Sequence, residues 1–244
     1  MKIRLITSAV IAVSAVVCAA SLVAQAAQQS SISESGRQVA INVQSGTNTS
    51  GIAEVTLIGP PTSQADIDDY SYTLPMQKGR IAGTLTNPWS GKTDVSVVML
   101  GTKTIANATV TGTGPALTEQ QLDLLPSYLM DSNIPTVAQQ ARAIASSVTT
   151  QGTSRNQAVA DATMQWVKQH IQTVNQSQTA RADRTLASGD GNQASQTALA
   201  VALLRADNIP AQTVQEQVTQ DGMYGTSYSV QAWLDDKWLK VGTP

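Results

Sequence analysis

The chain contains one cysteine and one histidine, Cys18 and His170, the two side-chain types that most often combine in nucleophilic catalysis. A thiolate is an effective nucleophile when an imidazole lies beside it and a third group orients the ring. Cys18 lies in a segment that we expect to be removed, and His170 lies on the apolar stripe of a predicted helix. A lone histidine there is typical of a core or rim residue. This pair therefore does not predict thiol chemistry.

The first 26 residues have the pattern of a secretory signal peptide. Two basic residues are followed by an uncharged apolar run over residues 5–23 and by a small-x-small cleavage site at Ala24–Ala26. The apolar run is also about as long as a membrane-spanning helix, and lipidation of Cys18 is a third interpretation, although the residues before it match a lipobox poorly. We favour cleavage after Ala26, which predicts a secreted, cell-surface or periplasmic protein without cysteine.

The composition argues against several classes of function. The formal net charge is −2, and it would fall to −4 when the two basic residues of the signal segment leave without any acid. A mildly acidic chain with 13% charged residues and no basic cluster indicates neither a nucleic-acid binder nor a membrane-surface protein. One histidine cannot make a typical zinc site, and the acidic run at 66–69 lacks EF-hand spacing. We therefore predict no metal and no cofactor.

The N-terminal half has the pattern of β-structure. Residues 27–36 are polar and aperiodic, so we expect a flexible leader. From 37 to 114, short runs that alternate apolar and polar residues are separated by glycine, proline and asparagine, most clearly at 39–43 and 94–100. Several short strands with regular turn signals predict an immunoglobulin-like β-sandwich as the domain at 37–114.

The period changes after residue 115, where helical spacing replaces alternation. Helices are predicted to begin near Pro135 and Ser154, and a further helix at 193–207 is apolar on nearly all sides. A helix of that kind is usually central and buried. Strand-like runs follow it, so helices precede strands and the fold class is α+β, with a second domain at 115–244.

Four segments of this second half occur in the order of a known family. They read SYLMDSNIPTVAQQARAIASS (127–147), AVADATMQWVKQHI (158–171), GNQASQTALAVALLRADNIPAQTV (191–214) and QAWLDDKWLKVG (231–242). Together they resemble the transglutaminase-like superfamily over roughly residues 117–244. The resemblance implies a papain-like α+β core whose active members use a Cys-His-Asp triad.

The departures from the family pattern lie at the triad positions. On the motifs above, Gln193 stands at the cysteine position, Gln231 at the histidine position and Gly242 at the aspartate position. A glutamine amide is not a nucleophile and does not exchange protons near neutral pH. The sequence therefore predicts a transglutaminase-like protein that is not an enzyme.

The favoured function is binding through the inherited cleft. We expect Gln193, Gln231, Trp233 and Tyr228 to line it, and neutral amides suit a cell-wall peptide, a glycan or a protein of the bacterial envelope. Trp233 is also explained as a core aromatic. One alternative is a structural or adhesive surface module with no ligand in the cleft. The other is an active transglutaminase or peptidase that uses groups not evident in the sequence.

Overall fold

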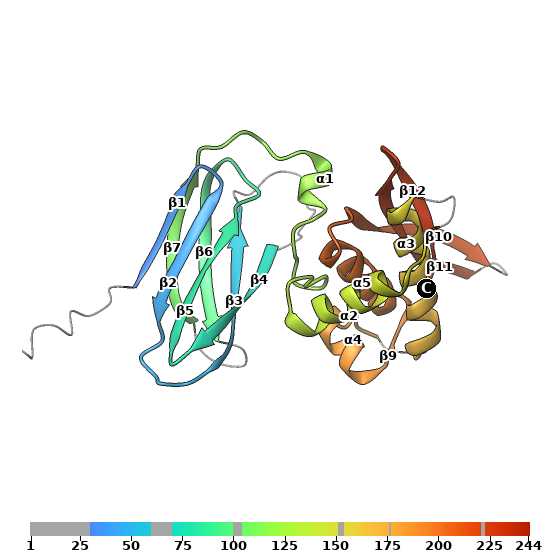
Figure 1. Ribbon diagram of the computed structural model, residues 1–244, viewed down its shortest axis with the longest axis horizontal. Coiled ribbons are helices and arrows are strands. Elements are labelled where there is room, and N and C mark those ends of the chain that lie inside the picture. The colour runs from blue at the N-terminus through green and yellow to red at the C-terminus, as the bar shows by residue number, and fades with distance from the viewer. Residues whose placement is uncertain (1–29, 60–69, 100–103, 151–153, 176, 221–222) are drawn as a thin grey trace, which may run out of the picture.

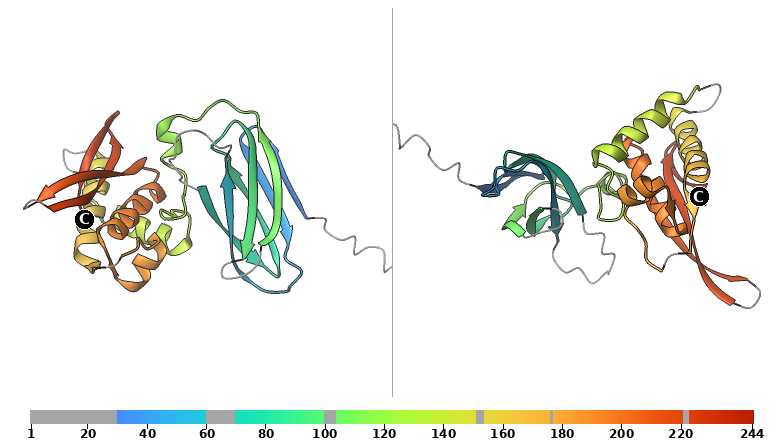
Figure 2. Two further views of the ribbon diagram at one scale, coloured as in Figure 1. Left: turned by 180° about the vertical axis from the view of Figure 1, so that it is seen from behind. Right: turned by 90° about the horizontal axis from the view of Figure 1, so that it is seen from below.

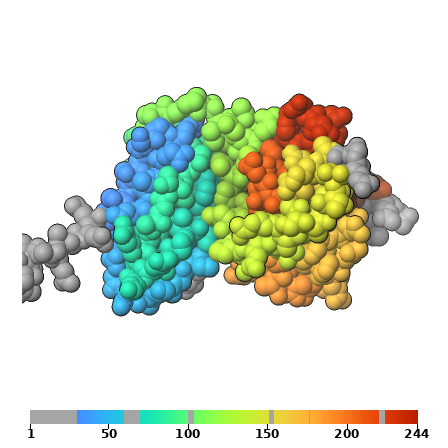
Figure 3. All heavy atoms as spheres, viewed as in Figure 1, coloured from blue at the N-terminus to red at the C-terminus, as the bar shows by residue number. Residues whose placement is uncertain are grey.

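A computed structural model describes residues 30–59, 70–99, 104–150, 154–175, 177–220 and 223–244. It has an all-β N-terminal half and a C-terminal half of helices and strands, packed side by side (Figures 1 and 3). The predicted signal segment with Cys18 and the acidic run at 66–69 lie outside the described residues. Among the helices that the structure describes, none is both long and apolar enough to cross a membrane.

The N-terminal half is built from seven antiparallel strands in the order β1-β2-β5-β4-β3-β6-β7. Most of them follow the alternation of apolar and polar residues that a half-buried strand requires. Their bounds are β1 Ser31–Ser35, β2 Gln38–Gln44, β3 Gly51–Ile58, β4 Tyr70–Gln77, β5 Arg80–Thr86, β6 Gly91–Met99 and β7 Thr104–Gly112.

These strands form one hydrogen-bonded sheet that nearly closes on itself. β4 and β5 pair only at Met76↔Ile81 and Gln77↔Arg80, beside their turn, so the strands diverge beyond that point. The two arms of the sheet then share one apolar core, in which Val39 and Val55 are fully buried. The predicted immunoglobulin-like sandwich is not confirmed, because hydrogen bonds connect all seven strands rather than two separate sheets.

The prediction of a flexible leader at residues 27–36 is wrong over Ser31–Ser35, because these residues form β1. This strand pairs with β2 from Ser31↔Asn42 to Ser35↔Gln38. Ile32 is its single large apolar residue, and it packs against the core of the sheet. A short edge strand with one apolar side chain has too little periodicity to be distinguished from a loop.

The C-terminal half contains helices first and a three-stranded sheet last, which confirms the α+β class (Figure 2). A two-stranded parallel pair, β8–β9, lies between the helices. The bounds are α1 Glu119–Leu122, α2 Pro135–Ser147, α3 Arg155–His170, β8 Gln172–Thr173, α4 Ala182–Ser188, β9 Asp190–Gly191, α5 Gln193–Ala206, β10 Ala211–Gln220, β11 Met223–Leu234 and β12 Lys237–Gly242.

Helix α5 is the centre of this half. Helices α2, α3 and α4 and strands β10 and β11 all pack against it. Leu199, Leu203 and Leu204 have no exposed surface, and each such side chain contributes about 1.5–3 kcal/mol of burial. The prediction of a central, buried helix is confirmed. Its position fixes its N-terminal residue, Gln193, against the surrounding elements.

A buried ion cluster joins the two halves. Arg181, immediately before α4, pairs with Glu54 of β3 at 3.0 Å, with Asp131 at 2.9 Å and with Asp183 at 3.2 Å. Thr73 of β4 donates its hydroxyl to the Asp131 carboxylate at 2.8 Å. The junction is therefore made of charged and polar contacts. Loss of any one partner would destabilise the fold, because a buried charge without a counterion is unfavourable in free energy.

Candidate functional site

Gln193 is the first residue of α5, and the helix N-terminus is well defined. The Asn192 side chain caps the helix by accepting from the Ser195 backbone N–H at 2.8 Å. The Ser195 hydroxyl accepts from the Ala180 N–H at 2.8 Å, which ties the preceding loop to the helix. A helix N-terminus lowers the pKa of a cysteine thiol placed there. The glutamine amide at this position has no comparable proton to lose.

The structure brings Gln193 together with Tyr228 of β11. The Gln193 Oε1 atom accepts a hydrogen bond from the Tyr228 backbone N–H at 3.3 Å. This contact connects the start of the central helix to the strand that carries Gln231. Two of the four residues predicted to line a cleft are therefore in direct contact, and one of them is held by its side chain.

Gln231 and Trp233 lie elsewhere on the same strand. Strand alternation places them on one face of β11, whereas Ala232 and Leu234 belong to the apolar core on the other face. The Gln231 side chain accepts from Gln212 of β10 at 3.5 Å. Within the described residues, no hydrogen bond connects Gln231 to Gln193. The two glutamines therefore have separate partners.

Gly242 has a backbone conformation that favours glycine. Its φ is +144°, a value that residues with a side chain rarely adopt. It pairs with Val230 next to an irregularity between β11 and β12. An aspartate at this position would carry backbone strain. The residue at the third triad position therefore has no carboxylate, and its backbone conformation is unfavourable for an aspartate.

Comparison with known proteins identifies this half of the molecule. The model of the Transglutaminase-like superfamily matches residues 142–243, a segment that includes Gln193, Gln231 and Gly242. Residues 142–243 are therefore the transglutaminase-like part of this chain. A search of curated proteins found no match.

Two solved structures are similar to most of the chain. One is a "Putative Cysteine Protease" from Cytophaga hutchinsonii, 12% identical with a TM-score of 0.44. This match covers 83% of the present chain and 73% of the protease chain. The other is a "Putative Protease" from Parabacteroides distasonis ATCC 8503, 16% identical with a TM-score of 0.37. This match covers 83% of the present chain and 39% of the protease chain.

The single histidine is not at any of the three triad positions of the family pattern. His170 is exposed in the last turn of α3, where its ring stacks on Trp166 with centroids 4.6 Å apart. Its Nδ1 atom is 2.8 Å from the Trp166 carbonyl oxygen. Among the described residues, no group of histidine, cysteine, aspartate or glutamate is arranged to hold a metal ion. His170 is therefore a surface residue whose ring stacks on Trp166, one turn earlier in the same helix.

Trp233 forms an aromatic pair across the β11–β12 hairpin. Its ring meets Trp238 edge to face, with centroids 5.6 Å apart. Such a pair is worth about 0.5–1.5 kcal/mol beyond the area it buries. Both rings are half-buried. The geometry supports packing as one use of Trp233 and leaves part of the ring at the surface.

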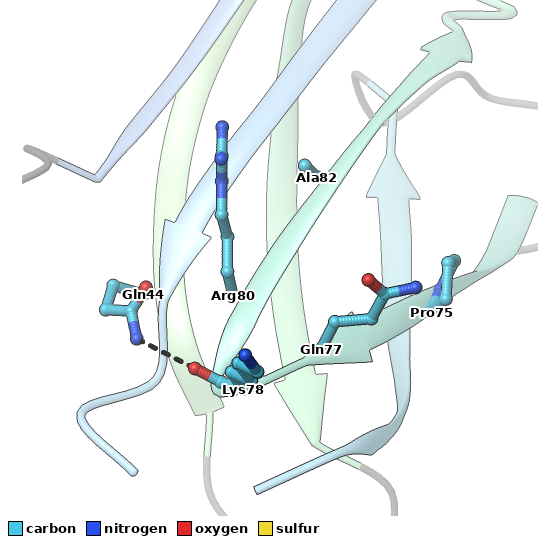
Figure 4. A pocket seen from close by; sticks show the side chains of 6 residues that line it. All are labelled: Gln44, Pro75, Gln77, Lys78, Arg80 and Ala82. Atoms are coloured by element: carbon cyan, nitrogen blue, oxygen red, sulfur yellow. Dashed lines mark hydrogen bonds between the residues drawn. The ribbon is translucent and has the colours of Figure 1, made fainter. Parts of the chain in front are cut away.

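The structure also contains cavities that the sequence did not predict, and Gln193, Gln231 and Trp233 line none of the three described below. One, of about 650 Å³, lies where β4 and β5 diverge and is lined by Gln44, Pro75, Gln77, Lys78, Arg80 and Ala82 (Figure 4). A second, of about 420 Å³, lies between α2 and α3. The third, of about 620 Å³, is in the transglutaminase-like half beside Tyr128, Arg181 and Arg184.

Proposed function

We propose that this protein is a secreted, non-catalytic member of the transglutaminase-like superfamily that binds a peptide, a glycan or a protein of the cell envelope. The observation that carries the proposal is the hydrogen bond from the Tyr228 N–H to Gln193 Oε1. On the family motifs, this neutral amide, already engaged with β11, stands where active relatives would hold a nucleophilic thiol.

The other triad positions support the absence of catalysis. Gln231 cannot act as a proton acceptor near neutral pH, and it is engaged with Gln212. Gly242 supplies no carboxylate, and its positive φ opposes a simple return to aspartate. After removal of residues 1–26 the chain would contain no cysteine. A thiol mechanism would therefore have neither its nucleophile nor its base.

Binding is supported by the groups at the inherited site. The Gln193 and Gln231 amides can both donate and accept hydrogen bonds, which suits peptide backbone and sugar hydroxyls alike. Tyr228 and Trp233 are both partly exposed and add aromatic surface on the same strand. Ligand sites commonly combine a few such polar groups with aromatic walls.

The test is capture of envelope components by the chain that begins at Ala27, compared with its Gln193→Ala and Gln231→Ala variants. Gln139→Ala is the matched control, because Gln139 is an exposed glutamine on α2, distant in sequence from both. Loss of one bound component in both variants but not in the control is the expected result. Turnover of a peptide substrate by the unmodified chain would overturn the proposal.

A structural or adhesive module is the second candidate. Two observations favour it: the Gln193 amide is bonded to backbone, and none of the three cavities described above includes the inherited site. A component that both glutamine variants still capture would support this candidate and would direct attention to other surfaces of the molecule.

A further inference from the structure

The cavity of about 620 Å³ in the transglutaminase-like half has the chemistry of a ligand site. Its lining combines one aromatic ring, four uncharged polar residues, one alanine and two arginines, namely Tyr128, Asn175, Ser177, Gln178, Thr179, Ala180, Arg181 and Arg184. Its volume falls in the range of pockets that hold small ligands, about 300–1,000 Å³. We propose that this cavity binds an acidic saccharide.

The Tyr128 ring is a rigid surface for stacking. It is 48% exposed, and the Arg181 guanidinium carbon lies 4.8 Å from its centroid. Arg181 is itself immobilised by ion pairs with Glu54, Asp131 and Asp183. A ring that is already fixed offers a large amphipathic surface and loses little conformational entropy when a ligand stacks on it. A sugar ring, which has an apolar face, is suited to such a surface.

The wall formed by residues 177–180 is held in place from the start of α5. Asn192 donates through Nδ2 to the Gln178 carbonyl at 3.1 Å, and the Ala180 N–H donates to the Ser195 hydroxyl at 2.8 Å. Ser177, Gln178 and Thr179 of this wall carry hydroxyl or amide groups, which both donate and accept. They match the hydroxyl and acylamino groups of a sugar better than they match an apolar ligand.

Arg184 selects for a negative charge. Arg181 already pairs with three carboxylates through Nη1, Nη2 and Nε, so its positive charge is neutralised within the protein. Arg184 is exposed and makes no hydrogen bond or ion pair within the part of the chain that the structure describes. A guanidinium binds a carboxylate through two parallel hydrogen bonds. One free cation beside neutral donors points to a saccharide with a single carboxylate rather than to a polyanion.

The inference goes beyond the proposed function, because it uses neither Gln193 nor Gln231. Two sugars that differ by one lactyl ether, which carries the carboxylate, test it: N-acetylmuramic acid and N-acetylglucosamine, titrated at low salt and followed by amide chemical shifts. The acid is expected to bind several-fold more tightly, with the largest shifts at residues 177–184. Arg184→Gln should remove this preference, whereas Gln193→Ala should leave it intact.

Tyr128 provides the second arm of the experiment. Tyr128→Ala should abolish binding of both sugars, and Tyr128→Phe should retain it, which separates loss of stacking from loss of the fold. Tyr224→Ala is the control, because Tyr224 is 87% exposed and lies outside the cavity. Equal weakening by Tyr224→Ala, or no shift with either sugar, would overturn the inference. Equal binding of the two sugars, unaffected by Arg184→Gln, would overturn the assignment of an acidic ligand.

Discussion

Arg181 and Glu54 are 127 residues apart in the chain, yet their side chains form a 3.0 Å ion pair. Through this pair the loop before α4 contacts β3 of the N-terminal sheet. Asn133 adds a second link, since it donates to the Thr73 carbonyl at 2.9 Å and accepts from the Thr73 N–H at 3.1 Å. The two halves are thus joined by specific polar contacts.

Arg181→Ala should destabilise the protein strongly, by about 3–5 kcal/mol, because buried carboxylates would lose their counterion. The measurement is the free energy of unfolding from denaturant titration. Arg184→Ala is the matched control, three residues along and exposed, and should change stability by less than about 0.5 kcal/mol. Similar effects of the two substitutions would contradict the importance of the buried cluster.

Asp131 should make the stability of the junction depend on pH. Burial raises the pKa of Asp131 to about 6, while the Thr73 hydrogen bond and the Arg181 charge lower it, and Asp183 and Glu54 raise it. Because the folded pKa lies above the unfolded value, the folded state binds more protons. This contribution to stability is fully present below the unfolded pKa, near 4, and is lost as pH rises through about 6.

The measurement is unfolding free energy from pH 4 to pH 7, in the natural chain and in Asp131→Asn. Asn is nearly the same size as Asp and does not titrate, so the difference between the two curves isolates Asp131. A difference that stays constant over this range would show that Asp131 titrates at its ordinary value in the folded state.

Gln193→Cys should create a reactive thiol. Its position at the N-terminus of α5 favours the thiolate, so its pKa should lie below the usual value of about 8.5. Alkylation rate against pH measures it, in a chain that starts at Ala27 and so has no other cysteine. Tyr224→Cys, on an exposed part of β11, is the control and should titrate near 8.5. Identical profiles would argue against a formed helix-end site.

Gly242→Asp should destabilise the protein by about 1–3 kcal/mol, since a side chain at φ +144° strains the backbone. Gly225→Asp is the comparison, because Gly225 also lies on the β10–β11–β12 sheet, is exposed and has no positive φ. Thermal unfolding of the two variants distinguishes backbone strain from the low propensity of aspartate for β-strands. A smaller loss at position 242 than at 225 would refute the strain argument.

The elements predicted correctly from the sequence are those whose hydrophobic pattern lies within a single continuous segment. The apolar content of α5 and the helical spacing of α2 and α3 are read within single segments, and the structure confirms them. The near-closed sheet was not predictable, because closure depends on pairing between distant strands such as β2 and β5. Alternation reports which face of a strand is buried and says little about its neighbour.

The family motifs located these residues along the chain, but they did not predict the structural role of each residue. The arginine in the ALLRA motif, Arg205, is buried and donates to the Ala211 carbonyl at 2.9 Å and the Leu125 carbonyl at 2.7 Å. It therefore organises the chain around the end of α5. The Tyr128 cavity was missed because Tyr128 is distant in sequence from the rest of the lining, which comes from residues 175–184, a polar segment without hydrophobic periodicity.

Arg181 belongs both to the junction and to the wall of the Tyr128 cavity. The two regions therefore respond together to mechanical load. A force that pulled the N-terminal sheet from the transglutaminase-like half would act on the Arg181–Glu54 contact, and so on the residue that lies over the Tyr128 ring. The apolar cores of the two halves are separate clusters, so this load reaches the cavity wall without passing through a shared core.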